Sequence, residues 1–195
     1  HVPVWGTYIS SKVLHPGLLC RIITENKKSM METSLNKKEN QEAAPCRNIL
    51  ITGANGQLGN EMRVLAKANT MHNYFFTDVE ELDICNEQAV NNFVNQHEVD
   101  IIVNCAAYTA VDAAEDHQEL NDRLNHLAPG YLAHAIQSRG GTIIQVSTDY
   151  VFDGTNHIPY TEDEPTCPAS AYGTAKLAGE KNVMDNCEKA AVIRT

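Results

Sequence analysis

The sequence has few aromatic residues, a deficit of basic side chains and no long apolar run. Aromatic residues make up 6% of its 195 residues, and 15 Lys plus Arg stand against 25 Asp plus Glu, giving a formal net charge of −10 at pH 7. No stretch approaches the roughly 18 to 20 consecutive apolar residues of a transmembrane helix. Because an acidic chain repels phosphate backbones and anionic lipids, we expect neither a nucleic-acid partner nor a membrane partner.

Paired metal-ligand motifs are missing as well. The six cysteines form no C-x-x-C pair, and the eight histidines show neither H-E-x-x-H nor zinc-finger spacing. We therefore predict no metal site and no disulfide framework. Free thiols within apolar runs fit a reducing, cytoplasmic setting.

The composition changes near residue 45. Residues 1–45 carry six basic and four acidic side chains, whereas residues 46–195 carry nine and 21. The segment 24–45 is rich in Lys, Asn, Glu and Gln, and buries too little apolar surface to offset the entropy of ordering. We expect 1–45 to be a disordered or non-native extension, with translation starting at Met30 or Met31, and 46–195 to form one domain that is incomplete at its C-terminal end.

From residue 48 onward, short apolar runs alternate with longer helical patterns. Five runs indicate strands covered on both faces: 48–52, 74–77, 100–105, 142–147 and 190–194. Four segments place apolar residues at helical spacing: 57–68, 86–97, 119–138 and 170–186. Asp83 or Asn86 can cap the second helix, and residues 149–168 form a long loop. The alternation predicts an α/β fold with a doubly wound parallel sheet, most simply in the strand order 3-2-1-4-5.

A glycine-rich loop, G-x-x-G-x-x-G, joins the first strand to the first helix. In such loops the first glycine allows a tight turn, the second lets the backbone approach a pyrophosphate, and the third lets helix and strand pack closely. The candidate residues for binding a dinucleotide are Gly53, Asn55, Gly56, Gln57, Leu58 and Gly59. The alternative is a glycine turn with no ligand.

An acidic residue follows the second strand. Asp78 lies 19 residues after Gly59, where a carboxylate can accept hydrogen bonds from an adenosine ribose and favours NAD over NADP. It equally fits a surface turn in an acidic stretch, so both NADPH and NADH stay open. Asp83, Ile84, Ala106 and Ala107 are expected beside the adenine and ribose.

Candidate catalytic groups follow the fourth strand. Ser147 and Thr148 end that strand, and Tyr172 and Lys176 lie four residues apart on one face of the last helix. A lysine ammonium near the phenol would lower its pKa, and the hydroxyl of Thr148 or Ser147 would hold a carbonyl oxygen for protonation by Tyr172. Taken alone, Y-x-x-x-K also fits a solvated aromatic and cation pair.

Together these motifs resemble the extended short-chain dehydrogenase/reductase family. The similarity covers residues 47–195 and is carried by the strings 53–59, 104–112, 147–152 and 172–180. It implies a Rossmann fold, truncated before a C-terminal substrate domain. It also implies that Thr148, Tyr172 and Lys176 are catalytic, that Tyr172 is the proton donor, and that Tyr172, Lys176 and Tyr108 contact the cofactor. Asn125 would support the lysine through a water relay, or else be a polar residue in helix packing.

The branch of the family with these strings implies a specific reaction. Its members reduce the C4 ketone of dTDP-4-dehydro-β-L-rhamnose to dTDP-L-rhamnose with NADPH or NADH, and this product serves polysaccharide synthesis. The resemblance thus implies a nucleotide-sugar substrate and a homodimer for the complete protein. Since relatives continue past the strand that ends this chain, we expect the chain alone to be inactive. Two alternatives remain: an epimerase or dehydratase that retains NAD, and a non-catalytic NADP-binding regulatory subunit.

Overall fold

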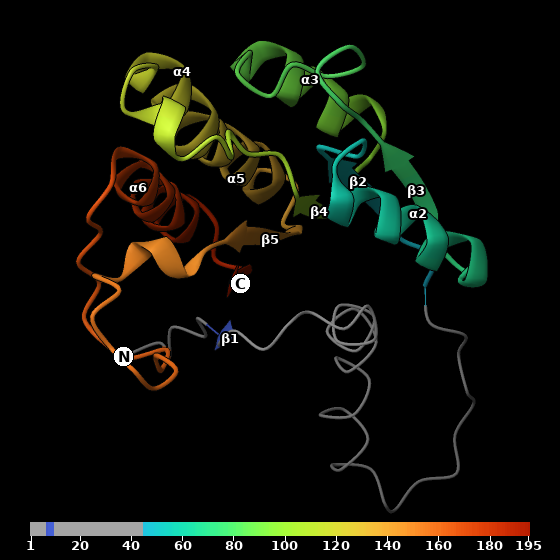
Figure 1. Ribbon diagram of the computed structural model, residues 1–195. Helices are drawn as coiled ribbons and strands as arrows, with labels where there is room; N and C mark the ends of the chain where they lie inside the picture. Colours follow the sequence, from blue (N-terminus) through green and yellow to red (C-terminus); the bar gives the residue numbers. More distant parts are fainter. Residues whose placement is uncertain (1–6, 10–44) are drawn as a thin grey trace, which may run out of the picture.

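The computed structural model describes residues 7–9 and 45–195, in which six parallel strands form one sheet (Figure 1). The strands are β1 (Thr7–Ile9), β2 (Asn48–Thr52), β3 (Asn73–Phe76), β4 (Ile101–Asn104), β5 (Thr142–Ser147) and β6 (Ala190–Arg194). The predicted α/β fold with a parallel sheet is confirmed, and β2, β5 and β6 have the predicted bounds.

The first strand comes from the segment that was expected to be an extension. Thr7–Ile9 pair in parallel with residues 191–193 of β6, at the edge of the sheet, so the predicted five strands are one too few among the described residues. The rest of that segment up to residue 44, with the start at Met30 or Met31, lies outside the described residues.

The helices largely follow the predicted segments. They are α2 (Gln57–Ala68), α3 (Glu87–Gln96), α4 (Gln118–Asp122), α5 (Ala128–Gln137) and α6 (Ala171–Asn186). Asn86 caps α3, because its side chain accepts a hydrogen bond from the amide of Ala89. A π-helical turn (Arg123–Leu127) joins α4 to α5; Pro129, near the start of α5, has no N–H to continue the regular ladder. No helix in 45–195 has both the length and the apolar character needed to cross a membrane.

The strand order corrects the sequence prediction. The sheet runs β1-β6-β5-β4-β2-β3, which is 2-1-3-4-5 when the five predicted strands are numbered along the chain, so 3-2-1-4-5 is wrong. Both orders allow right-handed crossovers, and handedness therefore does not separate them. What separates them is the face that α3 covers. Val90 of α3 belongs to the same core as Leu132 of α5, so α3 crosses the face opposite α2 and brings β4 beside β2.

Two hydrophobic cores lie on the two faces of the sheet. Helices α3, α5 and α6 cover one face, where Leu50, Ile102 and Ile143 of three neighbouring strands pack against them. Helix α2 contributes Met62 to the other core, which contains Ile51 of β2. The carboxyl ends of the strands are thereby held at one edge of the sheet, where ligands bind in folds of this kind.

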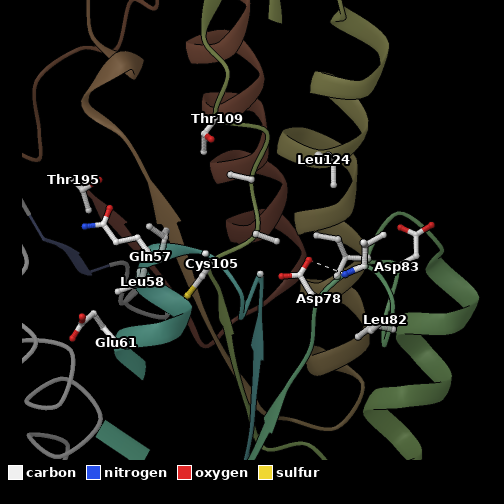
Figure 2. A pocket seen from close by; sticks show the side chains of 17 residues that line it. Gln57, Leu58, Glu61, Asp78, Leu82, Asp83, Cys105, Thr109, Leu124 and Thr195 are labelled. Carbon is white, nitrogen blue, oxygen red and sulfur yellow. Dashed lines mark hydrogen bonds between the residues drawn. The ribbon is translucent and has the colours of Figure 1, made fainter. Parts of the chain in front are cut away.

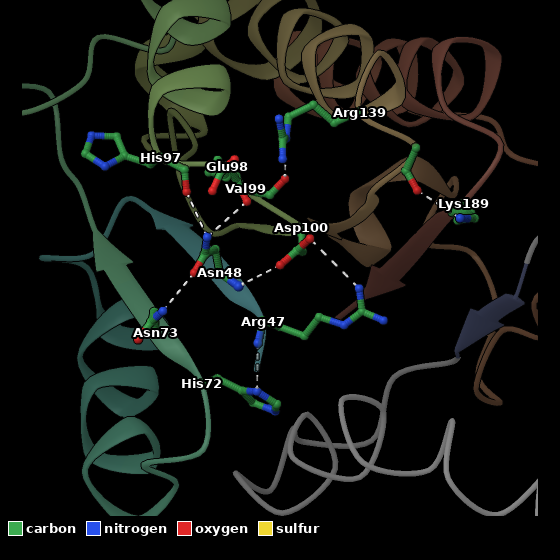
Figure 3. A network of polar contacts seen from close by, with 11 residues as sticks. Arg47, Asn48, His72, Asn73, His97, Glu98, Val99, Asp100, Arg139 and Lys189 are labelled. Carbon is green, nitrogen blue, oxygen red and sulfur yellow. Dashed lines mark hydrogen bonds and ion pairs between the residues drawn. The ribbon is translucent and has the colours of Figure 1, made fainter. Parts of the chain in front are cut away.

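The opposite edge is tied together by side chains (Figure 3). The amide group of Asn48 donates to the carbonyl oxygens of His97 (3.0 Å) and Glu98 (3.1 Å), and its oxygen accepts from Asn73 Nδ2 (2.9 Å). The backbone amide of Asn48 also donates to Asp100 Oδ2 at 2.8 Å. These bonds link the starts of β2, β3 and β4 far from the carboxyl ends of the strands.

The predicted long loop after β5 is present and mostly exposed. It begins with a short 3₁₀ turn (Asp149–Val151) and continues without regular structure to Ser170. The rings of Phe152 and Tyr160 stack at 4.2 Å, and the Tyr160 hydroxyl donates to Asp153 Oδ1 at 2.9 Å. The loop therefore has internal order next to the start of α6.

Candidate functional site

A pocket of about 980 Å³ opens at the carboxyl ends of the strands (Figure 2). Its wall contains these predicted cofactor residues: Gly53, Gly56, Gln57, Leu58, Asp78, Asp83, Ile84, Ala106 and Ala107. It also contains residues that the sequence argument missed: Glu61, Val79, Leu82, Cys105, Thr109, Leu124, Val146 and Thr195. Several of the missed residues lie at the end of a strand or directly after it, and this position in the sequence could have identified them as pocket residues. The pocket includes the boundary between β2 and β4, where the strand order reverses.

The glycine loop has the geometry that its spacing suggests. Gly53 has a φ of +60°, and a Cβ there would lie 2.6 Å from the backbone of Ala106. A Cβ on Gly59 would lie 2.5 Å from the Cα of Ala54, so this glycine lets α2 pack closely against the loop. Gly56 stands at the N-cap of α2, where no side chain caps the helix and no acidic residue occupies the first turn. The N-terminus of α2 thus faces the pocket as a site suited to an anion.

Asp78 bridges β3 and the glycine loop. Its Oδ2 accepts from the backbone amide of Asn55 at 3.0 Å, and its Oδ1 accepts from the amide of Val79 at 2.9 Å. The Asn55 side chain points to Arg63, whose Nη2 donates to Asn55 Oδ1 at 3.2 Å. Asp78 therefore orders the loop and lines the pocket, and its contact with an adenosine ribose stays a prediction.

Two of the three candidate catalytic residues, Thr148 and Tyr172, lie side by side, and Lys176 follows one turn later on α6. Ser170 caps α6 by accepting from the amide of Gly173 at 3.1 Å, and Tyr172 and Lys176 follow on the face of α6 that is buried against the sheet. The Thr148 side chain lies beside the Tyr172 phenol and lowers its pKa, while its own hydroxyl donates to Asp149 Oδ1 at 3.2 Å. The ring of Tyr150 meets that of Tyr172 edge-on at 5.6 Å. The structure thus places Thr148 next to Tyr172.

Lys176 reaches the pocket wall from α6. Its side chain is 3% exposed, and its Nζ donates to the carbonyl oxygen of Val146, a pocket residue, at 2.7 Å. Burial lowers the pKa of Lys176 to about 8, and the charges of Glu180 and Cys105 oppose that fall. The ammonium is therefore easier to deprotonate than an ordinary lysine.

The pKa of the Tyr172 phenol is shifted in the direction opposite to the one expected from the sequence. Burial raises the pKa of Tyr172, Thr148 opposes the rise, and Asp149 adds to it. The expectation that Lys176 lowers this pKa is wrong for the described structure, because desolvation of the phenol outweighs the other influences and the ammonium is held by Val146.

The side chain of Asn125 holds the backbone at Tyr108, and among the described residues its hydrogen bonds do not go to Lys176. Its Oδ1 accepts from the backbone amide of Tyr108 at 3.1 Å, and its Nδ2 donates to the Tyr108 carbonyl at 2.9 Å and to Asn121 Oδ1 at 2.7 Å. The side chain therefore clamps the segment that follows β4, beside Ala107 in the pocket wall. A water relay from Asn125 to Lys176 stays a prediction.

Comparisons with known proteins show what this chain is similar to. The dTDP-4-dehydrorhamnose reductase of Salmonella typhimurium is 42% identical over 153 residues, which are 76% of this chain and 50% of the relative. A crystal structure of a dTDP-4-dehydrorhamnose reductase from Clostridium acetobutylicum matches with a TM-score of 0.74 and 46% identity, over 75% of this chain and 52% of that one. The Bacillus anthracis enzyme, solved in complex with NADP, matches with a TM-score of 0.74 and 35% identity, over 76% and 53%.

The chain spans about half the length of these relatives. The family model described as the RmlD substrate binding domain matches residues 47–195, which include the glycine loop, the pocket wall and all the candidate catalytic residues. On this match the chain belongs to the RmlD substrate binding domain family.

Proposed function

We propose that this chain is the dinucleotide-binding half of an NAD(P)H-dependent dTDP-4-dehydrorhamnose reductase. One observation carries the proposal: the same pocket is lined by the uncapped N-terminus of α2 and by Val146, whose carbonyl holds Lys176. A cofactor in this pocket would therefore have its pyrophosphate at the glycine loop and its nicotinamide end at the catalytic candidates.

The pocket residues fit NADPH or NADH. The first turn of α2, with Gln57 and Leu58 in the wall, suits a pyrophosphate because helix N-termini bind anions. A Cβ on Gly56 would meet only the Gly53 carbonyl oxygen at 3.3 Å, so the backbone at Gly56 is open to close approach. Asp78 would receive the ribose hydroxyls, beside Leu82, Asp83 and Ile84 for the adenine.

In this reading the protein supplies the proton and the bound nicotinamide supplies the hydride. The raised pKa of Tyr172 keeps its phenol protonated at neutral pH, which suits a proton donor to the C4 oxygen of the sugar. Thr148 contacts the phenol and would hold that oxygen in line with it. Lys176 would bind the nicotinamide ribose from the pocket wall near Val146.

The substrate would be a small nucleotide sugar, and the complete protein a homodimer in a reducing cytoplasm. The relatives named as dTDP-4-dehydrorhamnose reductases support the substrate class. Cys46, Cys85, Cys105, Cys167 and Cys187, the cysteines of residues 45–195, are free thiols, which fits a reducing compartment.

The test is the oxidation of NADPH by the full-length gene product in the presence of dTDP-4-dehydrorhamnose, followed by absorbance. Oxidation that requires the sugar nucleotide, and that falls at least a hundredfold in Tyr172→Phe while NADPH still binds, is the expected result. Cofactor that remains bound through gel filtration without net oxidation would instead indicate an epimerase or dehydratase. Cofactor binding without any turnover would indicate a regulatory subunit.

A further inference from the structure

A row of buried polar side chains crosses the sheet at its carboxyl edge. Thr52 and Asn104 end two neighbouring strands, Gln145 lies two residues before the end of the third, and the three are in register with one another. Two residues earlier, the same strands carry the apolar row of Leu50 and its neighbours in the core under α3, α5 and α6. Since side chains two residues apart share a face, the polar row lies on the face that α6 covers. All three are 2% exposed or less.

The polar row is continuously hydrogen-bonded. Thr52 Oγ1 donates to Asn104 Oδ1 at 2.6 Å, and Asn104 Nδ2 donates to Gln145 Oε1 at 2.7 Å. Gln145 Nε2 in turn donates to the carbonyl oxygen of Val146 at 2.9 Å. That same carbonyl accepts from Lys176 Nζ at 2.7 Å. The row thus ends on the atom that holds the lysine.

Two backbone groups, the amide of Ala106 and the carbonyl of Val146, determine which side-chain atom donates in each hydrogen bond of the row. The amide of Ala106, which can only donate, bonds to Asn104 Oδ1 at 3.2 Å and so identifies that atom as the oxygen. Asn104 must then present its NH₂ group to Gln145, and Gln145 must present its own NH₂ group to Val146. Because the carbonyl of Val146 can only accept, it completes the same orientation.

We propose that Gln145 is a positioning residue for Lys176. It acts through the carbonyl of Val146, which it holds in the orientation that receives the lysine ammonium. Thr52 and Asn104 fix the direction of the Gln145 amide, and Asn104 ties the row to Ala106 in the pocket wall. The lysine and one wall of the pocket thereby form one hydrogen-bonded unit.

Two titratable groups also act on the lysine: Glu180, which lies one turn along α6 and is bound to Arg194 of β6 through Oε2 and Nη2 at 2.7 Å, and Cys105, which follows β4. Gln145 differs from the Glu180 carboxylate in being neutral, so it can fix the position of the ammonium without adding a charge next to it. A polar row that is satisfied at every atom also costs less to bury than one with an open end.

The positioning role of Gln145 rests on the proposed function only for its kinetic test. The variant that tests this role most directly is Gln145→Glu. Below its own ionisation the new carboxylic acid can accept from Asn104 and donate to Val146, so the variant keeps the fold at acidic pH. Once ionised it places a negative charge next to the lysine, which favours the ammonium. Gln145→Met, of similar volume, removes both hydrogen bonds. Asn48→Leu is the control, because it removes side-chain amide hydrogen bonds at the opposite edge.

The experiment uses the full-length gene product, labelled with ¹³C at the lysine Cε and titrated by NMR, with Lys176→Arg to assign the signal. We expect Gln145→Glu to move the Lys176 titration upward by about one pH unit or more. We expect Gln145→Met to lower kcat about tenfold to a hundredfold, since misplaced catalytic groups lose rate on this scale. Asn48→Leu should change neither quantity.

Two results would overturn the positioning role of Gln145. One is a Lys176 titration in Gln145→Glu that coincides with the wild-type curve. The other is a kcat in Gln145→Met no lower than in Asn48→Leu. If the wild-type protein does not oxidise NADPH with the sugar nucleotide, the proposed function fails, while the titration still decides the positioning role.

Discussion

Replacing Lys176 with methionine should stabilise the fold at neutral pH. Burial lowers the pKa of this lysine from its ordinary value of 10.5 to about 8. Since one pKa unit is worth about 1.4 kcal/mol, keeping the buried ammonium charged at pH 7 costs the folded state roughly 3 kcal/mol. Methionine removes that cost. It also loses the hydrogen bond to Val146, worth about 1 kcal/mol, so the expected net gain is about 2 kcal/mol.

The dependence on pH is the distinguishing feature of this prediction. Between pH 8 and 10.5 the unfolded chain binds more protons at residue 176 than the folded chain, so the penalty fades as pH rises. The advantage of Lys176→Met should therefore shrink by about 1.4 kcal/mol per pH unit in that window, vanish at about pH 9.5 and leave the variant about 1 kcal/mol less stable than wild type at the upper end. Burial also raises the pKa values of Tyr172 and, to about 12, of Cys105, which lowers stability at high pH in both proteins. The Tyr172 contribution cancels in their difference, whereas methionine also removes the influence of Lys176 that lowers the pKa of Cys105.

The assay is urea unfolding of wild type and Lys176→Met at pH 7, 9 and 10.5, followed by circular dichroism. Lys181→Met is the matched control, because Lys181 is exposed on the same helix and such changes stay within about 0.5 kcal/mol. A Lys176→Met protein that is less stable than wild type at pH 7 would refute the reasoning. So would a stability difference that stays constant across the three pH values.

Three further substitutions test the pocket and the opposite edge. Gly59→Ala should weaken NADPH binding at least tenfold, measured by fluorescence titration, since the new Cβ would lie 2.5 Å from the Cα of Ala54 and displace the glycine loop. Asp78→Asn should raise the affinity for NADPH relative to NADH, measured as the ratio of the two Kd values, because it removes the carboxylate that repels a 2′-phosphate. Asn48→Leu should lower the free energy of unfolding by about 2 kcal/mol, through the loss of its side-chain hydrogen bonds, and leave the NADPH Kd unchanged.

Helices and strands could be predicted where residues close together in the sequence determine their bounds. The run from Asn48 to Thr52 is apolar and ends at Gly53, so its bounds as a strand follow from local chemistry. The cap at Asn86 likewise depends on residues three positions away. The strand order was not predictable from such signals, because it depends on which face α3 covers, and that is decided by contacts with α5.

The candidate site also has parts that could be predicted from the sequence and parts that could not. Its glycine loop and the pair of Tyr172 and Lys176 are visible as spacings, whereas the row of Thr52, Asn104 and Gln145 is not. Those three residues are 52 and 41 positions apart, and only the register of the sheet aligns them. The raised pKa of Tyr172 also escaped prediction, since burial is set by packing rather than by the spacing of the motif.

Polar side chains have different effects on stability at the amino ends and at the carboxyl ends of the strands. At the amino edge, Asn48 exchanges hydrogen bonds with backbone carbonyls and a neighbouring amide, and no charge is buried by it. At the carboxyl edge, Lys176 is 3% exposed and carries a charge whose burial opposes folding. A protein selected for stability alone would have an apolar residue at this position of α6. The cost at this one position, set against the satisfied bonds at the other edge, therefore argues that Lys176 is kept for chemistry rather than for the fold.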